Sequence, residues 1–437
     1  MRCDWQKFSI ADLLAQNVLY IGDGYRAKLE ELDPAGLPFA RAGNIDGGFH
    51  FDDADRFPEQ NLLRVGNKVS QAPDVVFTSK GTVGRFALVR QDTPRFVYSP
   101  QLCFWRVLQS DRICPRFLFY WMSGREFYSQ YKGVAGQTDM AEYVSLSDQR
   151  RMYITLPPLG EQRAIAHILG TLDDKIELNH RTNETLEAMA RTIFKSWFVD
   201  FDPVRAKAEG RQPSGMEAAT AALFPDSFED SPLGKIPKGW SAANLAEFAV
   251  LNPEVWTRHN APDHIEYVDL SNVKRGRIET TASYLWKDAP TRAQRVLRPG
   301  DTIVGTVRPG NSSYAFISDN SLTGSTGFAV LRPRKSFFRE IVYLAATALD
   351  NMEKLAHLAD GAAYPAVRPG AVASTDIPKA PDPILDCFSK AVGPLLKSMA
   401  ASCCESRTLA ATRDALLPKL ISGEIRAEDH AALETDA

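Results

Sequence analysis

Apolar residues between positions 157 and 200 recur at alternating steps of four and three, which is the spacing of one face of a long α-helix. The apolar positions are Ile165, Leu169, Leu172, Ile176, Leu186, Ala190, Ile193 and Trp197. The two positions that continue this register through the middle of the segment are Asn179 and Asn183. The pattern predicts one long helix with an apolar seam that is polar at its centre.

The same register recurs 223 residues further along the chain, between positions 381 and 425. Its positions are Phe388, Val392, Leu395, Met399, Ser402, Ser406, Leu409, Arg413, Leu416 and Leu420. A single seam of this kind usually reflects ordinary core packing. Two seams of equal length and register instead favour two helices that pair with each other, most simply antiparallel. The matched polar positions would fix the register at some cost in stability.

Each predicted helix follows a segment with the pattern of a mixed α/β domain. At 74–85 and again at 301–311, a short β-type run ends in a glycine-containing turn with a basic residue, and a second β-type run follows. We therefore expect an α+β/mixed fold with two α/β domains, each followed by a long helix, the two helices pairing as an antiparallel coiled coil. The predicted divisions are domains at 1–156 and 237–380, helices at 157–200 and 381–425, a connector at 201–236 and an acidic tail at 426–437.

The composition is that of a multidomain protein without a membrane span. The 437 residues are too many for one core, and 44% hydrophobic with 24% charged residues is typical of globular domains. No apolar run approaches the roughly 20 residues that cross a bilayer, and no signal-peptide pattern follows the start, so we expect a cytoplasmic protein. The six cysteines form no CxxC pair and the seven histidines no metal-ligand spacing, so we expect neither a disulfide framework nor a metal site.

The charge pattern restricts any nucleic-acid surface to local regions. A net charge of −3 counts against a protein that binds a long stretch of phosphate backbone unaided. Between Lys80 and Arg116, however, seven basic residues face two acids, and between Arg292 and Arg339 eight basic residues face two acids. Basic side chains bind phosphates, and polar side chains on exposed turns can hydrogen-bond base edges. The pattern therefore predicts one DNA-contacting region in each domain.

The candidate DNA contacts are basic, polar and aromatic residues on two turns of each domain. In the first domain they are Thr78, Ser79, Lys80, Thr82, Arg85, Gln137 and Thr138. In the second domain they are Arg308, Asn311, Ser312, Ser313, Tyr314 and Tyr364. Weaker candidates on other turns are Lys68, Lys274, Arg275 and Arg277. For each of these residues the alternative is a solvated surface charge or a turn-forming role.

Sequence signatures of catalysis are missing. The chain has no GxxxxGK[ST] phosphate loop and no glycine-rich cofactor fingerprint after a predicted strand. It also lacks the Asn/Asp-Pro-Pro-Tyr/Phe tetrapeptide of adenine methylases; the nearest sequence, at 251–254, lacks the second proline and the aromatic residue. We therefore expect a non-catalytic chain whose partners perform any chemistry.

Three motifs resemble those of one protein family. Pro157-Pro158-Leu159-x-Glu161-Gln162-x-x-Ile165-Ala166-x-x-Leu169, with Phe194-Lys195-Ser196-Trp197-Phe198-Val199-Asp200-Phe201 further on, resembles the central conserved region of type I restriction-modification specificity subunits. The segment 233–240 is similar to the start of their second recognition domain, and 413–425 to their distal conserved region. The resemblance spans nearly the whole chain.

The resemblance implies double-stranded DNA as a ligand, with one half of a split target read by each domain and an unread spacer set by the helices. It also implies two modification subunits that carry S-adenosylmethionine and methylate adenine, and restriction subunits that use ATP and magnesium. These would dock on the conserved helices, through the seam residues named above together with Glu161 and Gln162. The distal region departs from the pattern, because residues 384–386 are Ile-Leu-Asp where the proximal region has Glu-Gln-Arg.

Two other functions remain open at this stage. A free-standing DNA-binding regulator would bind its site tightly without partners, which the near-neutral charge disfavours. A coiled-coil scaffold with two protein-binding lobes would need no matched basic turns. From 165 to 197 the predicted helix would span ~48 Å, between one and one and a half turns of B-DNA at ~34 Å per turn. We therefore expect lengthening both helices to widen an unread spacer without changing the bases that are read.

Overall fold

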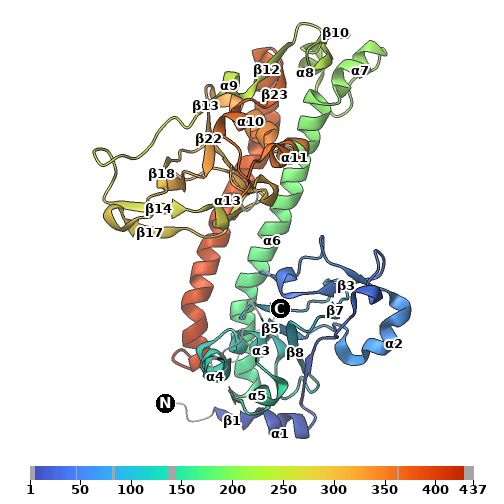
Figure 1. Cartoon of the computed structure of the whole chain (residues 1–437), viewed down its shortest axis with the longest axis vertical. Coiled ribbons are helices and arrows are strands. Elements are labelled where there is room, and N and C mark those ends of the chain that lie inside the picture. The colour runs from blue at the N-terminus through green and yellow to red at the C-terminus, as the bar shows by residue number, and fades with distance from the viewer. Residues whose placement is uncertain (1–4, 46, 81–83, 136–143, 362–363, 428–437) are drawn as a thin grey trace, which may run out of the picture. The chain divides into compact units, whose positions relative to one another are not determined.

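The computed structural model describes residues 5–45, 47–80, 84–135, 144–361 and 364–427 (Figure 1). The chain forms two units, one of Met1–Glu177 with Arg407–Ala437 and the other of Leu178–Ser406. The two long helices, α6 (Leu159–Phe198) and α13 (Asp382–Ser422), each contribute to both units. Within the described residues, no helix is long and apolar enough to span a membrane.

The boundaries of the long helices follow from their flanking residues. α6 begins after two prolines, and the Gln162 amide donates to the Pro158 carbonyl at 3.0 Å in its first turn. α13 has Pro383 as its second residue, a position at which the missing amide costs no hydrogen bond. It ends at Ser422, and the next residue, Gly423, has a φ of 72°, the left-handed conformation that commonly closes a helix.

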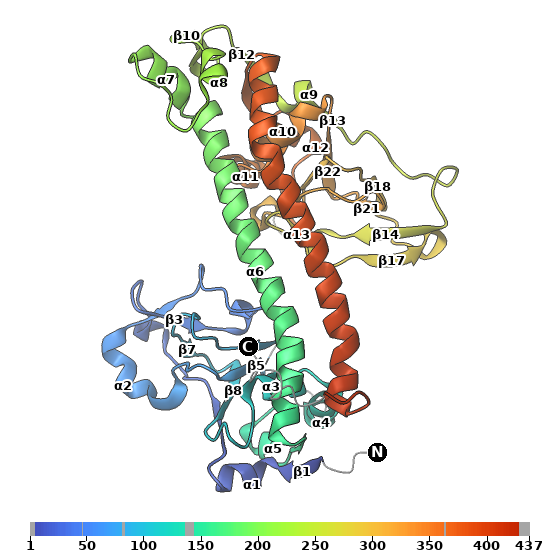
Figure 2. The same ribbon diagram turned by 180° about the vertical axis from the view of Figure 1, so that it is seen from behind.

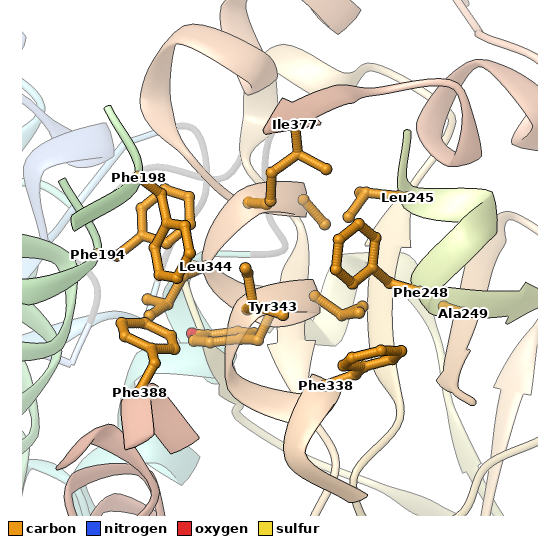
Figure 3. Packing of buried hydrophobic residues seen from close by; sticks show 14 of the residues in the cluster. Phe194, Phe198, Leu245, Phe248, Ala249, Phe338, Tyr343, Leu344, Ile377 and Phe388 are labelled. Atoms are coloured by element: carbon orange, nitrogen blue, oxygen red, sulfur yellow. The ribbon is translucent and has the colours of Figure 1, made fainter. Parts of the chain in front are cut away.

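Contacts within each unit show that α6 and α13 pair antiparallel. In the second unit, the ring of Phe198 near the end of α6 contacts Phe388 near the start of α13 (Figure 3), and so does the ring of Trp197. In the first unit, Arg413 Nη1 donates to Asp173 Oδ1 at 2.7 Å. Figure 2 shows the two helices side by side within the second unit. The predicted antiparallel helix pair is confirmed.

The polar centre of the predicted seam is buried. Asn179 and Asn183 are 4% and 5% exposed. Asn179 Nδ2 donates to Ser406 Oγ at 3.2 Å and to Glu405 Oε2 at 2.8 Å, and Asn183 Nδ2 donates to Cys403 Sγ at 3.3 Å. In the sequence repeat, Ser406 of the second helix takes the place of Asn183 in the first. Asn179 therefore contacts the residue that is equivalent to Asn183. The repeat and the helix pairing thus share one register.

The first unit contains a sheet with the strand order β2-β8-β5-β6 and a smaller sheet with the order β4-β3-β7, while β1 pairs with β9. The strands are β1 (Gln6–Ser9), β2 (Leu19–Asp23), β3 (Leu37–Ala40), β4 (Arg56–Phe57), β5 (Val75–Thr78), β6 (Phe86–Leu88), β7 (Val97–Tyr98), β8 (Leu102–Val107) and β9 (Tyr153–Leu156). The helices are α1 (Ile10–Ala15), α2 (Leu62–Val65), α3 (Pro115–Met122), α4 (Arg125–Ala135) and α5 (Leu146–Arg150). One core joins α1, α3 and the larger sheet to the start of α6 and the end of α13.

The second unit repeats this arrangement, with sheets in the orders β13-β22-β19-β20 and β17-β14-β21-β18, and with β12 paired to β23. The strands are β12 (Ser241–Asn244), β13 (Ala249–Leu251), β14 (His264–Val268), β15 (Val273–Lys274), β16 (Arg277–Ile278), β17 (Ala282–Leu285), β18 (Ala293–Val296), β19 (Thr302–Gly305), β20 (Tyr314–Phe316), β21 (Leu322–Ser325), β22 (Phe328–Pro333) and β23 (Asp376–Lys379). The helices are α9 (Leu245–Phe248), α10 (Arg339–Ala346), α11 (Leu349–Leu358) and α12 (Pro369–Ala373). The prediction of two mixed α/β domains, each followed by a long helix, is confirmed.

The core of the second unit extends from the domain onto the long helices. Figure 3 shows Phe194 and Phe198 of α6 with Phe388 of α13 on one side of Tyr343, and Phe248 and Phe338 on the other. The segment 201–236, expected to be a connector, contains α7 (Asp202–Ala208), α8 (Ala218–Ala222), β10 (Phe228–Ser231) and β11 (Gly234–Pro237), and it contributes to this core.

One buried ion pair occurs at the same place in both domains. In the first, Arg106 donates through Nε and Nη2 to both carboxylate oxygens of Asp74, at 2.6 and 2.7 Å. In the second, Arg332 does the same to Asp301, at 2.9 and 2.8 Å. Each aspartate precedes the strand that leads into a candidate DNA-contacting turn, β5 or β19. A two-pronged contact of this kind fixes the orientation of both partners, so the start of each of these strands is held rigidly.

Candidate nucleic-acid interface

The two candidate loops of the second domain lie together. The turn between β19 and β20 contains the short 3-10 helix η7 (Pro309–Asn311). The Arg308 amide donates to the Pro365 carbonyl at 2.7 Å, and the Val367 amide donates to the Thr306 carbonyl at 2.9 Å. The Arg308 guanidinium lies 4.7 Å from the centre of the Tyr364 ring, which is 71% exposed. A cation and an aromatic face are thus presented together at the surface.

The turn between β15 and β16 joins the same surface. The Arg275 amide donates to the Ser312 carbonyl at 2.9 Å, and the Gly276 amide donates to the Tyr314 carbonyl at 2.8 Å. Arg275 was only a weaker candidate in the sequence, because nothing local connects its turn with the one near residue 310. We call Arg275, Arg308, Asn311, Ser312 and Tyr364 the second-domain surface.

Backbone strain is concentrated on this surface. Arg275, Arg308 and Ser312 have φ values of 41°, 48° and 54°, in the left-handed region that residues with a Cβ seldom adopt. Such conformations cost on the order of 1–3 kcal/mol each and persist only where the surroundings fix them. Here the fixing groups are the backbone hydrogen bonds between the three turns. The strained backbone aims polar side chains outward, as expected for a recognition surface.

Two candidates in the second domain are not available to DNA. Ser313 and Tyr314 are 7% and 8% exposed, and the Tyr314 ring packs edge-on against Tyr343. The prediction that these side chains contact bases is wrong for this conformation, because both point into the domain. Arg308, Asn311 and Tyr364 are exposed, and Ser312 is half-buried.

In the first domain the structure separates the candidates in the same way. Thr78 and Ser79 are buried, and their prediction as base contacts is corrected for the same reason. Thr78 Oγ1 accepts from the Arg85 amide at 3.1 Å, and Ser79 Oγ donates to the Gln101 carbonyl at 3.3 Å. Lys80 is exposed. Thr82, Gln137 and Thr138 lie outside the described residues.

Arg85 supports the first-domain turn from one side. Its Nη1 donates to the carbonyls of Ala42 and Ile45 at 3.3 and 3.1 Å, which ties the turn to the 3-10 helix η2 (Ala42–Asn44). The Gln101 side chain accepts from the Ala42 amide at 3.0 Å. This places the exposed Arg41 and Gln101 beside the turn that carries Lys80. Neither residue could be found from a local pattern, because both lie outside the turn in the sequence, Arg41 by about forty residues.

One hydrogen bond occurs at the same place beside the candidate DNA-contacting turns of both domains. The Val144 amide donates to the Ser79 carbonyl at 3.2 Å, as Val367 does to Thr306 in the second domain. In each case the bond joins the turn that follows the central strand, β5 or β19, to the segment that precedes a short helix, α5 or α12. That helix is followed by β9 or β23 and then by α6 or α13. The same junction is therefore built twice.

The seam residues, which were also predicted to dock partners, are all buried or half-buried. Ile165, Leu169, Phe388 and Val392 are fully buried. The half-buried positions are Leu172, Ile176, Leu186, Ile193, Leu395, Met399, Leu409 and Leu416, and Trp197 and Leu420 are buried. These side chains pack within the protein, so we correct the prediction that the fully buried ones contact a partner.

Glu161 and Gln162 also have internal partners. Glu161 Oε2 accepts from Trp5 Nε1 at 3.0 Å and from Arg426 Nη1 at 2.7 Å. Gln162 Oε1 accepts from the Cys114 amide at 2.9 Å. Their assignment as docking residues is therefore corrected: Glu161 holds the segments of Trp5 and Arg426 against α6, and Gln162 holds the segment of Cys114. Within the described residues, no cluster of His, Cys, Asp or Glu could hold a metal ion.

Comparisons with known proteins agree with this arrangement. Residues 3–188 match the family model of the type I restriction modification DNA specificity domain. The chain is 24% identical over 392 residues to the type I restriction enzyme HindI specificity subunit of Haemophilus influenzae, covering 78% of this chain and 84% of that protein. It is 24% identical over 379 residues to the MjaIX specificity subunit of Methanocaldococcus jannaschii, covering 81% and 78%. The crystal structure of a type I restriction-modification S subunit from M. genitalium has the same fold, with a TM-score of 0.54, 14% identity and coverage of 95% and 96%.

Proposed function

Because the chain belongs to the family of type I restriction-modification DNA specificity subunits, we propose that it selects a two-part DNA target for methylation by partner subunits, with one part read by each domain. As a specificity subunit it is non-catalytic. S-adenosylmethionine would be bound by two modification subunits, and ATP and magnesium by restriction subunits. The unread spacer between the two parts would be set by α6 and α13.

The duplicated recognition turn is the observation that carries this proposal. Both domains have the same strand order in the sheet that carries the turn, β2-β8-β5-β6 and β13-β22-β19-β20, the same buried Asp-Arg pair and the same hydrogen bond at the base of the turn. The side chains on the two turns differ: the first presents Lys80, and the second presents Arg308 beside Tyr364. A repeated frame with different exposed side chains is what two unlike half-sites require.

The exposed side of α6 offers a docking face for a modification subunit. Leu178, Thr182, Thr185 and Met189 follow each other at steps of four, three and four, so they share one helix face. All four are uncharged and exposed, Leu178 by 57% and Met189 by 49%. Apolar side chains aligned on an exposed helix face favour burial against a partner. We expect Leu178→Glu with Met189→Glu to prevent co-purification of the modification subunits without lowering the melting temperature of the chain.

The test of the proposed function is to express the chain with its modification subunits and to map adenine methylation across a genome. We expect a motif of two specified parts separated by unspecified bases. Arg308→Ala or Tyr364→Ala should relax one part, and Lys80→Ala should relax the other. Arg211→Ala is a matched control, because this exposed cation pairs with Glu209 outside both turns, and it should change neither part.

Two results would contradict the proposal. A continuous motif, or one substitution that relaxes both parts equally, would show that the domains do not read separate halves. Tight sequence-specific binding by the isolated chain at physiological salt, with no methylation in the presence of the modification subunits, would instead support a free-standing regulator.

A further inference from the structure

Arg191 of α6 contacts Tyr314, a buried residue next to the second-domain surface. Its Nη2 donates to the Tyr314 hydroxyl at 3.2 Å, and its guanidinium lies 5.7 Å from the centre of the Tyr314 ring. Its Nε and Nη2 also donate to Glu187 Oε1, one helical turn earlier, at 3.1 and 2.5 Å. The carboxylate therefore holds the guanidinium in one orientation.

The same guanidinium reaches the element on the other side of the turn. Arg191 Nη1 donates to the Thr347 carbonyl at 3.0 Å, and Nη2 donates to Thr347 Oγ1 at 3.2 Å. Thr347 lies between α10 and α11, and α11 packs against η7, which follows Arg308. Arg191 thus holds both elements that support the turn between β19 and β20. One is β20, which follows the turn, and the other is α11, which packs on η7.

Tyr314 passes this constraint to the strained residues. Its amide donates to the Ser312 carbonyl at 3.1 Å, and its carbonyl accepts from the Gly276 amide at 2.8 Å. A methyl group at Gly276 would lie 3.0 Å from the Tyr343 hydroxyl and 3.4 Å from Glu187 Oε2, so the turn that carries Arg275 packs closely on the same network. Tyr343 in turn donates to Glu187 Oε1 at 3.2 Å.

The ionisation states favour this network. Burial raises the pKa of Tyr314, and the charge of Glu187 raises it further, so the hydroxyl stays protonated. Burial by itself lowers the pKa of Arg191, but Glu187 and the two tyrosines outweigh it and raise that pKa. The guanidinium therefore remains charged and can donate to all of its partners.

We propose that Glu187 and Arg191 are positioning residues for base reading by the second domain, through which α6 fixes Arg275, Arg308 and Ser312 in their strained conformations. The inference rests on the proposed function. The equivalent positions 223 residues later, on α13, are Ala410 and Asp414, and the described contacts of Asp414 are with Arg413, so the described part of the first domain has no counterpart of this pair at these positions. Loss of the network should therefore affect one half of the target only.

The chemistry requires arginine at position 191. Lysine keeps the charge but lacks the planar fork that reaches Tyr314, Thr347 and Glu187 together. Methionine keeps most of the apolar side chain and removes every donor. We therefore expect Arg191→Lys to be intermediate between the wild type and Arg191→Met, which a requirement for charge alone would not produce.

The experiment uses the chain assembled with its modification subunits. Methylation rates are measured on duplexes that carry each single-base change in either half of the target. We expect Arg191→Met to reduce discrimination by roughly 10-fold in the half that Tyr364→Ala also affects, which is the size of one lost base contact, and to leave the other half unchanged. Lys195→Met is the matched control, since it removes a cation from the next turn of α6 whose partner is the exposed Asp200, and it should change neither half.

The outcomes separate the inference from the function on which it rests. A wild-type complex without a two-part motif would overturn both. A two-part motif with Arg191→Met discriminating like the wild type, or losing discrimination equally in both halves, would overturn the inference alone. If Arg191→Met does not fold, Tyr314→Phe decides, because it removes only the hydroxyl that Arg191 contacts. It should weaken discrimination in the same half, and an unchanged half would overturn the inference.

Discussion

The duplicated ion pair allows one substitution to be compared at two equivalent places. Asp74 is 0% exposed and accepts from Arg106, from the Tyr98 hydroxyl at 2.6 Å and from the Gln71 amide at 2.9 Å. Asp301 is 1% exposed and accepts from Arg332 and from the Arg298 amide at 2.8 Å. The substitutions Asp74→Asn and Asp301→Asn remove the same charge from the same structural position.

The expected magnitudes differ because Arg332 has a second carboxylate partner. Removing one member of a buried pair costs about 3–5 kcal/mol, since the other charge is left uncompensated. Asp74 is the only described carboxylate that contacts Arg106, so Asp74→Asn should cost that amount in free energy of unfolding. Arg332 also contacts the half-buried Glu254, which would keep its charge paired. Asp301→Asn should therefore cost about 1.5–3 kcal/mol, the value of hydrogen bonds to a charged group.

Native-state hydrogen exchange with mass spectrometry measures the two domains separately. A difference of about 2 kcal/mol corresponds to about 30-fold in the opening equilibrium, read from peptides that cover β5 and β8 or β19 and β22. Asp386→Asn is the control, because its pair with Lys390 is exposed to solvent and should contribute little to stability. The reasoning is refuted if Asp301→Asn loosens its domain as much as Asp74→Asn loosens the other.

Three further predictions concern buried polar groups. Burial raises the pKa of Glu340 above its ordinary 4.5, so the folded chain binds the proton more tightly than the unfolded chain does. The stability of the fold therefore falls as the pH rises above 4.5. Glu340→Gln should remove this fall and raise the urea midpoint at pH 7. Trp5→Phe should cost about 1–3 kcal/mol more than Trp240→Phe in urea unfolding, because Trp5 donates to Glu161 whereas the Trp240 indole nitrogen has no partner among the described residues. Asn183→Leu should raise the unfolding midpoint, since the buried Oδ1 lacks a partner among those residues; a lower midpoint would show that its Nδ2 contact outweighs this cost.

The helix pair could be predicted because its signal is repeated. Each seam position alone is compatible with any amphipathic helix, but a register that recurs after 223 residues leaves one simple pairing. The structure buries or half-buries every position of that register, including Asn179 and Asn183. What the repeat could not decide was which residues face a partner, because packing between the two helices and docking on a third protein use the same apolar side chains.

The sequence could predict that turns follow the central strands β5 and β19, but not which side chains of those turns are exposed. Lys80 and Arg308 are exposed, and their contact with DNA stays a prediction. Thr78 and Tyr314 nevertheless point inward, because a hydroxyl serves equally well to hold a turn and to contact a base. Arg275 reaches the surface through backbone hydrogen bonds with Ser312, which no local pattern encodes.

The two domains share the frame of the recognition turn and differ in how each is fastened to the long helices. Gly170 of α6 makes room for Arg116, and its repeat equivalent Gly393 of α13 makes room for Glu340. The charge at this contact is thus reversed between the domains, and among the described residues only Arg116 has an ion-pair partner there, Asp174. Each domain packs against its own stretch of helix, so these contacts can diverge independently. The Asp-Arg pair cannot diverge in this way, because both of its members belong to the sheet that carries the turn. Exposed side chains on the turn can then vary while the frame stays intact.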